Sequence, residues 1–395
     1  MKWASGLSTE RELGPAVDEA VAGLRAGLGP LQPQLVLAFA AGYDSRDLER
    51  LPALLHSWLG SGLLISCSAG GVAGMGKELE DGPALSLLAG VMPDVQLAAI
   101  HLDQSALPSI TASRDAWWRL TGVRPEDEPS FTILADPYSF DVEHCIRGLD
   151  RAYPASTVVG GLTSAASQPG QACLIARGEV HRSGALLLTW TGNVQIEGVV
   201  GQGCRPVGDP LFVTSSDGNR IHEIDGKAPR QALGEVFSSL GTADRELFNA
   251  RQLFIGLALP GPRQSVGAGD FLVREVAGID SESGDLVIGG HAAAHTVVQF
   301  HLRDADASAA DLERELERHR SADPSAPAAA LMFSCIGRGA ALYGMPGRDS
   351  GMFRRAFGDV PLGGMFCAGE IGPVQGATFL HGFTTVFGLV RPRQR

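Results

Sequence analysis

Polar and sulfur-bearing side chains cluster where two apolar runs near the C-terminus end. The residues are Ser334, Cys335, Arg338, Cys367, Gly369 and Glu370. An arginine can bind a carboxylate through two parallel hydrogen bonds, and a glutamate can accept hydrogen bonds from an ammonium group. If the two runs are neighbouring strands, Arg338 and Glu370 lie at the same end of the sheet. Together they suit a zwitterion such as a free amino acid, with the arginine at its carboxylate and the glutamate at its ammonium group. The alternative is an internal Arg338–Glu370 ion pair beside tightly packed glycines.

The thiols allow a second chemistry, nucleophilic catalysis by Cys335 or Cys367. A thiol nucleophile needs a base such as histidine within hydrogen-bond reach. His381 approaches Cys367 if the segments 366–371 and 379–390 pair. Buried cysteines more often serve as small apolar side chains. We therefore expect a protein that is not an enzyme and has no catalytic residue, with a cysteine-dependent enzyme as an alternative.

Two further motifs have suggestive spacing without the expected context. The segment 71–78 resembles the GxxxxGK[ST] phosphate loop, but Glu78 stands where a hydroxyl group would hold magnesium. His291 and His295 have the i, i+4 spacing of paired metal ligands, but two glycines precede them and a strand-like run follows. No GxSxG or GxGxxG motif occurs. We expect no metal site.

The candidate residues need elements that bring strand ends together, and the sequence predicts such a unit three times. Each copy reads strand, helix, strand and glycine-rich turn, and the strand pairs are 34–41 with 63–67, 130–136 with 156–161, and 329–336 with 360–367. Parallel strands joined by a helix cross over right-handed, so each copy is a βαβ-like unit. The turns of the first two copies predict a corresponding ligand-binding crevice in the N-terminal half. Its residues are Cys67, Gly70, Gly71, Gly160 and Gly161.

Antiparallel hairpins are predicted between the second and third copies. The segments 211–216 and 219–224 flank Asp217-Gly218, a strong hairpin turn, and 270–279 pairs with 285–288. The predicted fold is α/β, mixed α+β in detail, with two related domains of βαβ-like units and antiparallel hairpins, and with mixed sheets covered by helices. The expected parts are a helical lead-in at 1–30, an N-terminal domain at 31–225 and a C-terminal domain at 226–395.

Composition indicates a globular chain that does not bind nucleic acid. Of 395 residues, 44% are hydrophobic and only 19% charged, which excludes intrinsic disorder. The net charge of −12 disfavours a polyphosphate partner. The start lacks the apolar core of a signal peptide, and no apolar run reaches the roughly 18 residues of a membrane span. Six scattered cysteines without a CxxC pair predict free thiols in a cytoplasmic protein.

Glycine is concentrated at the ends of the predicted strands. Many of the 51 glycines fall at 70–76, 160–161, 198–208, 337–339, 363–376 and 382. Glycine at such places lets the backbone come close to a ligand or to a neighbouring strand. Composition alone does not separate these two causes.

The motifs together resemble the FIST family. In the N-terminal half the matching segments are 35–41, 64–71 (LISCSAGG), 76–83 (GKELEDGP), 158–164 (VVGGLTS) and 198–214. In the C-terminal half they are 269–274 (GDFLVR), 298–304, 333–339 (FSCIGRG), 364–373 (GMFCAGEIGP) and 380–384 (LHGFT). The resemblance covers nearly the whole chain, from about residue 30 to 392.

This resemblance implies a ligand-sensing module. FIST domains occur fused to histidine kinases, chemoreceptors and cyclic-dinucleotide enzymes, and in an F-box protein. The family is inferred to bind small ligands such as amino acids, and some bacterial members are described as haem-containing nitric oxide sensors. This chain has no kinase, cyclase or receptor segment, so the resemblance implies a stand-alone sensor with a separate signalling partner. The predominance of arginine over lysine and the alanine content indicate a bacterial source. We expect no cofactor, with a haem sensor as an alternative, since no histidine lies in a motif that matches an axial ligand.

Overall fold

The computed structural model describes residues 1–259 and 271–393, which form two compact units. The first unit comprises Met1–Gly201 and Leu312–Arg395, and the second comprises Gln202–Asp311. The division expected between residues 225 and 226 falls inside the second unit, so the compact units and the predicted domains divide the chain differently. Gly269 and Asp270, which belong to a predicted motif and strand, lie outside the described residues.

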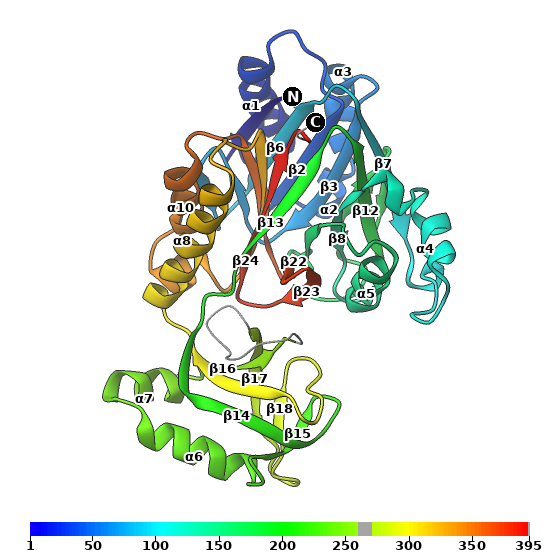
Figure 1. Ribbon diagram of the computed structural model, residues 1–395. Helices are drawn as coiled ribbons and strands as arrows, with labels where there is room; N and C mark the ends of the chain where they lie inside the picture. The colour runs from blue at the N-terminus through cyan, green and yellow to red at the C-terminus, as the bar shows by residue number, and fades with distance from the viewer. Residues whose placement is uncertain (260–270, 394–395) are drawn as a thin grey trace. The chain divides into compact units, whose positions relative to one another are not determined.

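Each of the three βαβ-like units forms a parallel strand pair, as predicted (Figure 1). The pairs are β2 (Leu35–Ala41) with β3 (Leu63–Ala69), β8 (Ser130–Ala135) with β9 (Val158–Leu162), and β20 (Ala329–Cys335) with β21 (Leu362–Cys367). The connecting helices are α2 (Ser45–Leu48) and α3 (Leu51–Leu59), then α5 (Val142–Ala152), then α9 (Gly339–Tyr343) and α10 (Arg348–Phe357). These strands are almost wholly buried, which explains their continuous apolar sequences.

The first unit contains three six-stranded mixed sheets. Equivalent strands of the three βαβ-like units occupy the same positions in each sheet. The first sheet is β1 (Lys2–Ser8), β6 (Ala84–Val91), β2, β3, β10 (Leu174–Ala176) and β11 (Glu179–His181). The second is β7 (Val95–Leu102), β12 (Ala185–Gly192), β8, β9, β22 (Gly369–Val374) and β23 (Ala377–His381). The third is β13 (Gln195–Gly201), β24 (Thr385–Arg391), β20, β21, β4 (Val72–Gly74) and β5 (Lys77–Leu79).

The last two strands of each sheet are a hairpin that another βαβ unit contributes. The hairpin β4–β5, which follows β3, joins the third sheet, and β10–β11, which follows β9, joins the first. The hairpin β22–β23, which follows β21, joins the second sheet. The exchange is cyclic, so each unit is hydrogen-bonded to both of the others.

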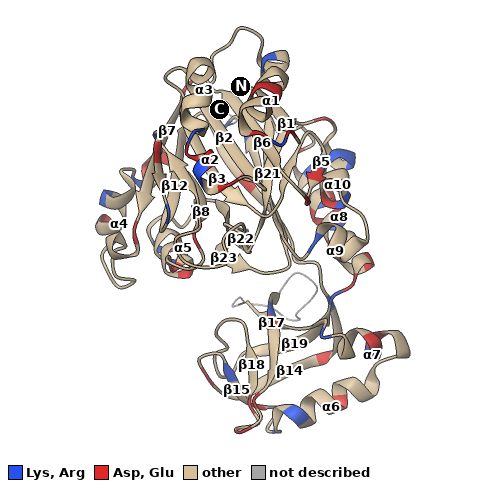
Figure 2. Ribbon diagram, turned by 180° about the vertical axis from the view of Figure 1, so that it is seen from behind, with Lys and Arg blue, Asp and Glu red and all other residues tan. Residues whose placement is uncertain are grey.

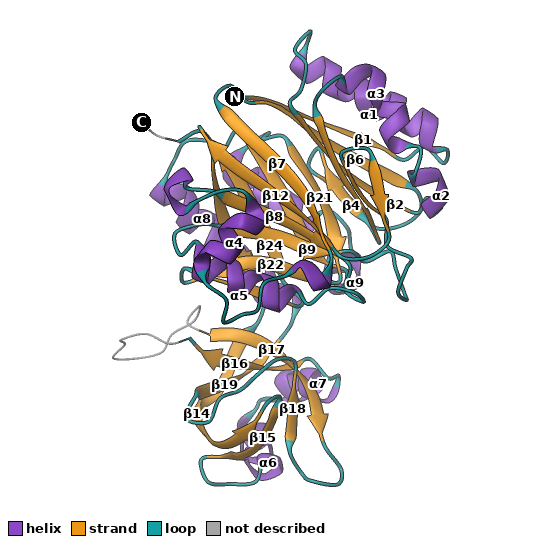
Figure 3. Cartoon of the chain, turned by 90° about the vertical axis from the view of Figure 1, so that its right-hand side faces the viewer, coloured by secondary structure: helices purple, strands orange, loops and turns teal. Residues whose placement is uncertain are grey.

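The inner faces of the three sheets share one hydrophobic core, and helices cover the outer faces (Figure 3). Phe39 of β2 and Phe333 of β20 meet edge to face in this core, with ring centroids 6.3 Å apart. Outside, α1 (Leu13–Leu28) and α3 pack on the first sheet, and α4 (Arg114–Thr121) and α5 pack on the second. Phe353 of α10 stacks on Phe387 of β24 in the third sheet, 4.9 Å between centroids.

The second unit is a closed barrel of six strands. Its order is β14 (Arg205–Asp217), β15 (Arg220–Ile224), β18 (Leu286–Ile288), β17 (Phe271–Ile279), β16 (Leu253–Ala258) and β19 (Val297–Leu302). The helices α6 (Pro229–Ser239) and α7 (Thr242–Asn249) belong to it, and α8 (Ala305–Ala322) leads back to the first unit. The predicted hairpin at Asp217-Gly218 is formed by β14 and β15, and Gly218 has the positive φ of 58° that its turn requires.

The charged residues lie mainly on helices and loops (Figure 2). The strands are mostly free of charge, in keeping with the buried sheets of the first unit. Within residues 1–259 and 271–393, no helix has the length and apolar character that a membrane span requires.

Candidate functional site

The turns that follow β3, β9 and β21 meet at one end of the first unit. The backbone N–H of Gly70 donates to Ser164 Oγ at 2.8 Å, and the Ser164 hydroxyl donates to the carbonyl oxygen of Phe366. The N–H of Phe366 in turn donates to the carbonyl oxygen of Gly71 at 2.9 Å. Ser164, in the turn after β9, therefore links the turn after β3 to the end of β21. The structure thus brings the N-terminal and the C-terminal candidate residues together.

Several of the candidate glycines allow close packing of the chain on itself. A Cβ atom on Gly161 would lie 2.3 Å from Sγ of Cys367, and one on Gly160 would lie 1.9 Å from the carbonyl oxygen of Ile133. Gly70 differs, because it is exposed and a Cβ atom there would meet nothing closer than 3.3 Å. Neighbouring protein therefore accounts for Gly160 and Gly161, while Gly70 faces solvent.

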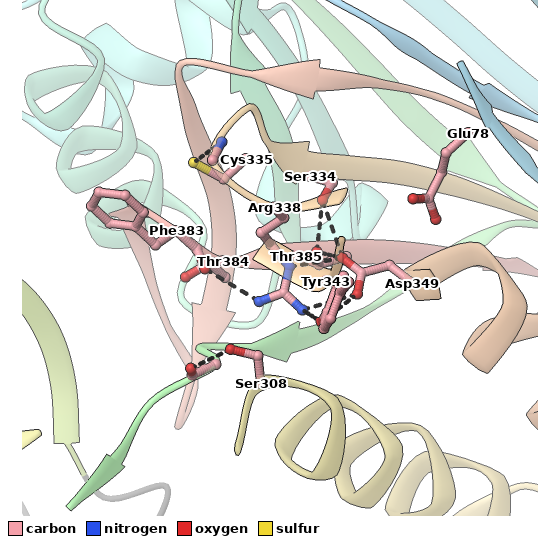
Figure 4. Close-up of polar contacts among 12 residues, drawn as sticks. Glu78, Ser308, Ser334, Cys335, Arg338, Tyr343, Asp349, Phe383, Thr384 and Thr385 are labelled. Carbon is pink, nitrogen blue, oxygen red and sulfur yellow. Dashed lines mark hydrogen bonds and ion pairs between the residues drawn. The ribbon is translucent and has the colours of Figure 1, made fainter. Parts of the chain in front are cut away.

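Arg338 is fully buried and forms a bidentate ion pair with Asp349 (Figure 4). Its Nε donates to Asp349 Oδ2 at 2.7 Å and its Nη2 to Oδ1 at 2.9 Å. Nη2 also donates to the Tyr343 hydroxyl at 2.6 Å, and Nη1 donates to the carbonyl oxygen of Phe383 at 3.3 Å. The guanidinium group predicted to bind a ligand carboxylate binds Asp349 instead, a residue that was not among the predicted site residues.

A polar network surrounds the carboxylate of Asp349. Its oxygens accept hydrogen bonds from the hydroxyl groups of Ser334, Tyr343 and Thr385. Burial opposes ionisation of Asp349, but the charge of Arg338 and these hydrogen bonds hold its pKa below the usual value. Burial raises the pKa of Tyr343, so its hydroxyl remains a donor.

Glu78 and Glu80 bind the two helices that follow β20. The carboxylate of Glu78 accepts the N–H of Gly347 at 3.0 Å and of Ser350 at 2.6 Å at the start of α10. Glu80 accepts the N–H of Ala340 in α9 at 2.9 Å. Burial, with the charge of nearby Asp349, raises the pKa of Glu78 to about 7. The segment 71–78 thus belongs to a hairpin whose Glu78 caps α10, and it is not a phosphate loop.

Glu370 is fully buried at the start of β22, opposite Gly161 of β9 and His381 of β23. Its Oε2 accepts the backbone N–H of Thr384 at 3.1 Å. Its Oε1 has no hydrogen-bond partner among the described residues. Burial raises the pKa of Glu370 well above the usual value. A buried polar atom without a partner is uncommon and marks a place for a ligand, an ion or a water molecule.

Two further buried residues at this end of the second sheet each keep an oxygen without a partner. Asp136 directly follows β8 and Thr163 directly follows β9. Oδ2 of Asp136 accepts the Ser139 hydroxyl, but Oδ1 has no hydrogen-bond partner within the described residues, and neither has Oγ1 of Thr163. Their position directly after paired strands was a signal in the sequence, although neither was predicted.

The thiols near this site are buried and apolar in character. Burial and the nearby Glu370 raise the pKa of Cys367 well above the usual value, and burial likewise raises the pKa of Cys67. Sγ of Cys67 lies 3.2 Å from Sδ of Met365. Nε2 of His381 lies 3.1 Å from the carbonyl oxygen of Gly372. A raised thiol pKa is the opposite of what a cysteine nucleophile needs.

Four cavities are formed by described residues, and none of them is lined by the charged residues of the candidate site. A cleft of about 300 Å³ is lined by Trp3 of β1 and Phe353 of α10, and the other three measure about 350 to 380 Å³. Neither Arg338 nor Glu370 lines any of these four cavities.

Haem does not fit these four cavities. No histidine or cysteine of the described chain lines any of them, so they lack the nitrogen and thiolate ligands that haem proteins use most often. The described residues also hold no group of three His, Cys, Asp or Glu side chains placed to bind a metal ion. We therefore derive no haem chemistry for this chain.

Comparison with known proteins gives matches along nearly the whole chain. The family model of the FIST N domain matches residues 34–227, and that of the FIST C domain matches residues 230–373. An uncharacterised protein of Mycobacterium tuberculosis is 33% identical over 391 residues, which cover 98% of this chain and 99% of that protein. An uncharacterised protein of Mycobacterium bovis is 31% identical over 395 residues, 98% of each chain. An F-box/LRR-repeat protein of Arabidopsis thaliana is 32% identical over 136 residues, 30% of this chain and 25% of that protein.

Proposed function

The chain belongs to the FIST family, and from that premise we propose that it is a stand-alone cytoplasmic sensor of a small ligand such as an amino acid. FIST domains are associated with sensory small-ligand binding, which gives the class of function. The ligand binds where the turns after β3, β9 and β21 meet. A separate protein partner receives the signal.

The observation that carries this proposal is the unpaired oxygen of Glu370 beneath the converging turns. Oε1 is fully buried and without a hydrogen-bond partner among the described residues, whereas Oε2 is held by Thr384. A half-satisfied buried carboxyl group costs about 1–3 kcal/mol, which a ligand donor would recover. Ala368, two residues before Glu370, is exposed, and so is Gly70 in the turn after β3, so solvent reaches the converging turns.

Arg338 has a positioning role in this proposal. Its bidentate pair with Asp349 fixes the segment between β20 and α10, and its Nη1 holds the carbonyl oxygen of Phe383 directly before Thr384. Arg338 therefore places the N–H that binds Glu370.

A thermal-shift screen of the full chain over the amino acids, with haem as a separate arm, tests the proposal. A ligand at 100 times its Kd raises the free energy of unfolding by about 2.7 kcal/mol. We expect one or more amino acids to raise Tm and Glu370→Gln to lose the shift. The control Glu313→Gln alters an exposed carboxylate on α8 and should keep it. An unchanged shift in Glu370→Gln would place the ligand elsewhere, and a Soret band after haem addition would favour a haem sensor.

A further inference from the structure

We propose that the group recognised at this site is a primary ammonium received by Glu370, so that the protein senses amines rather than carboxylic acids. This inference rests on the proposed function and names its ligand class. The contacts of the buried charged residues carry it.

The guanidinium group of the site has no free pair of donors with which to bind a carboxylate in the bidentate way. Of its five N–H donors, Arg338 gives two to Asp349, one to the carbonyl oxygen of Phe383 and one to the Tyr343 hydroxyl. A ligand carboxylate would have to displace Asp349, which is also held by three hydroxyl groups and is itself fully buried. Removing one partner of such a pair leaves an uncompensated buried charge.

Three buried oxygens at this end of the sheet have no hydrogen-bond partner among the described residues. They are Oε1 of Glu370, Oδ1 of Asp136 and Oγ1 of Thr163. Glu370 is paired in register with Gly161, two residues before Thr163, and Thr163 and Asp136 directly follow neighbouring parallel strands. An ammonium group carries three donors and no acceptor, which complements carboxyl and hydroxyl oxygens.

The balance of buried ionisable groups favours a cationic ligand as well. In the described part of the first unit, the buried carboxyl groups are those of Glu78, Asp136, Asp349 and Glu370, and the buried guanidinium groups are those of Arg338 and Arg391. Arg391 ends β24 and pairs with Glu197 and Asp323, while Thr385, at the opposite end of this strand, binds Asp349. Carboxyl groups therefore outnumber guanidinium groups at the end that holds Glu370.

The protonation of Glu370 makes amine binding depend on pH. Burial raises the pKa of Glu370, and the charged or titratable groups that act on it are Arg338, Cys335 and Cys367, with His381 opposite it on β23. An ammonium group favours the ionised carboxylate, so binding releases the proton that Glu370 holds. Affinity should therefore increase with pH until the amine itself loses its proton.

Calorimetric titration of the full chain with matched probes tests the ligand class. Each set shares one side chain: phenylalanine, phenethylamine and 3-phenylpropionate, then lysine and cadaverine, then leucine, isoamylamine and 4-methylpentanoate. We expect an amine to bind more tightly than its amino acid and the acid not to bind. Binding of an amino acid or acid without its amine overturns the inference and leaves the proposed function intact. Failure of every probe to bind overturns both.

Two further measurements locate the amine at Glu370. Glu370→Gln should raise the Kd of the best amine by about tenfold or more, as expected when a charged hydrogen-bond partner is lost, and Glu313→Gln should leave it unchanged. Where Glu370→Gln does not fold, wild-type titrations in buffers of different ionisation enthalpy report the proton released per ligand. Proton release that falls as pH rises from 6 to 9 supports the assignment. Binding without proton release over this range, or unchanged affinity in Glu370→Gln, overturns it.

Discussion

Arg338 and Glu370 are both fully buried ionisable residues, but they differ in how many of their polar atoms have hydrogen-bond partners. Arg338 gives four of its five donors to Asp349, Tyr343 and the carbonyl oxygen of Phe383. Glu370 has one oxygen bound and one without a partner among the described residues. From residue type alone, Arg338 and Glu370 were predicted to bind the two charged groups of a zwitterion. In the proposal their contacts give them different roles: Arg338 positions the chain, and Glu370 binds the ligand.

Replacing Arg338 by alanine should destabilise the protein by about 3–5 kcal/mol, because the charge of Asp349 is left buried and alone. Urea unfolding of the full chain measures this loss. The double variant Arg338→Leu with Asp349→Leu removes both charges and should recover much of it. Equal stability of the single and double variants would contradict a strong pair.

Sequence alone predicts that Arg338 and Glu370 lie near paired strand ends, but not which carboxylate Arg338 binds. Asp349 lies eleven residues further along, at the start of α10, and it meets Arg338 only because the two helices fold back over the strand end. The partner of a buried charge depends on such tertiary placement, which residue type and spacing do not encode.

At the scale of elements, the close approach of β21 to β9 depends on glycine. A Cβ atom on Gly161 would lie 2.3 Å from Sγ of Cys367, closer than real Cβ contacts. Gly161→Ala should therefore destabilise the protein by about 1–3 kcal/mol through overpacking.

A matched pair of variants isolates this contact in chemical unfolding experiments. Cys367→Ala removes the clashing sulfur and should offset much of the loss when combined with Gly161→Ala. The control Gly14→Ala, in α1 where a Cβ atom meets nothing within 4 Å, should be neutral or stabilising. A loss in Gly161→Ala that Cys367→Ala does not reduce would contradict this packing.

The cap formed by Glu78 on α10 should make stability depend on pH. The pKa of Glu78 is raised from 4.5 to about 7, so the native chain retains a proton that the unfolded chain loses in this range. The protonated Glu78 side chain therefore contributes fully to the free energy of unfolding below pH 4.5, and this contribution is lost as the pH rises through 7. Glu78→Gln cannot ionise, so its stability relative to wild type should increase by roughly 2–3 kcal/mol between pH 4.5 and 8. Urea unfolding across this range measures the difference, and parallel profiles would contradict a raised pKa.

The three βαβ units are the part of the fold that the sequence predicts best. Their strands are short apolar runs with glycine-rich ends, and each pair is adjacent in the chain apart from its helix. The cyclic exchange of hairpins could not be predicted, because β4, β10 and β22 each pair with a strand of another unit, and β4 and β10 have only three residues each. Local pattern indicates a strand, but it does not select a distant partner.

At the scale of the whole molecule, the second unit is an insertion that begins directly after β13 and ends within α8. All strands of the three shared sheets lie outside it, and a Cβ atom on Gly201 would lie 3.3 Å from Cα of Leu312. The two points of the first unit at which the insertion begins and ends therefore lie next to each other.

Replacing residues 202–311 by a short Gly-Ser linker should leave the first unit folded. Its core and all three sheets are made without the insertion, so circular dichroism and urea unfolding should show one cooperative transition. A non-cooperative, dye-binding chain would contradict the independence of the first unit.

Hydrogen-exchange mass spectrometry of the full chain, with and without the probe that gives the largest thermal shift, tests ligand binding at the converging turns most directly. Slower exchange should appear in the segments 68–71, 162–165, 366–370 and 382–385, which come from all three βαβ units. Protection confined to the second unit, or to the cleft lined by Trp3 and Phe353, with these turns unchanged, would contradict the proposed site.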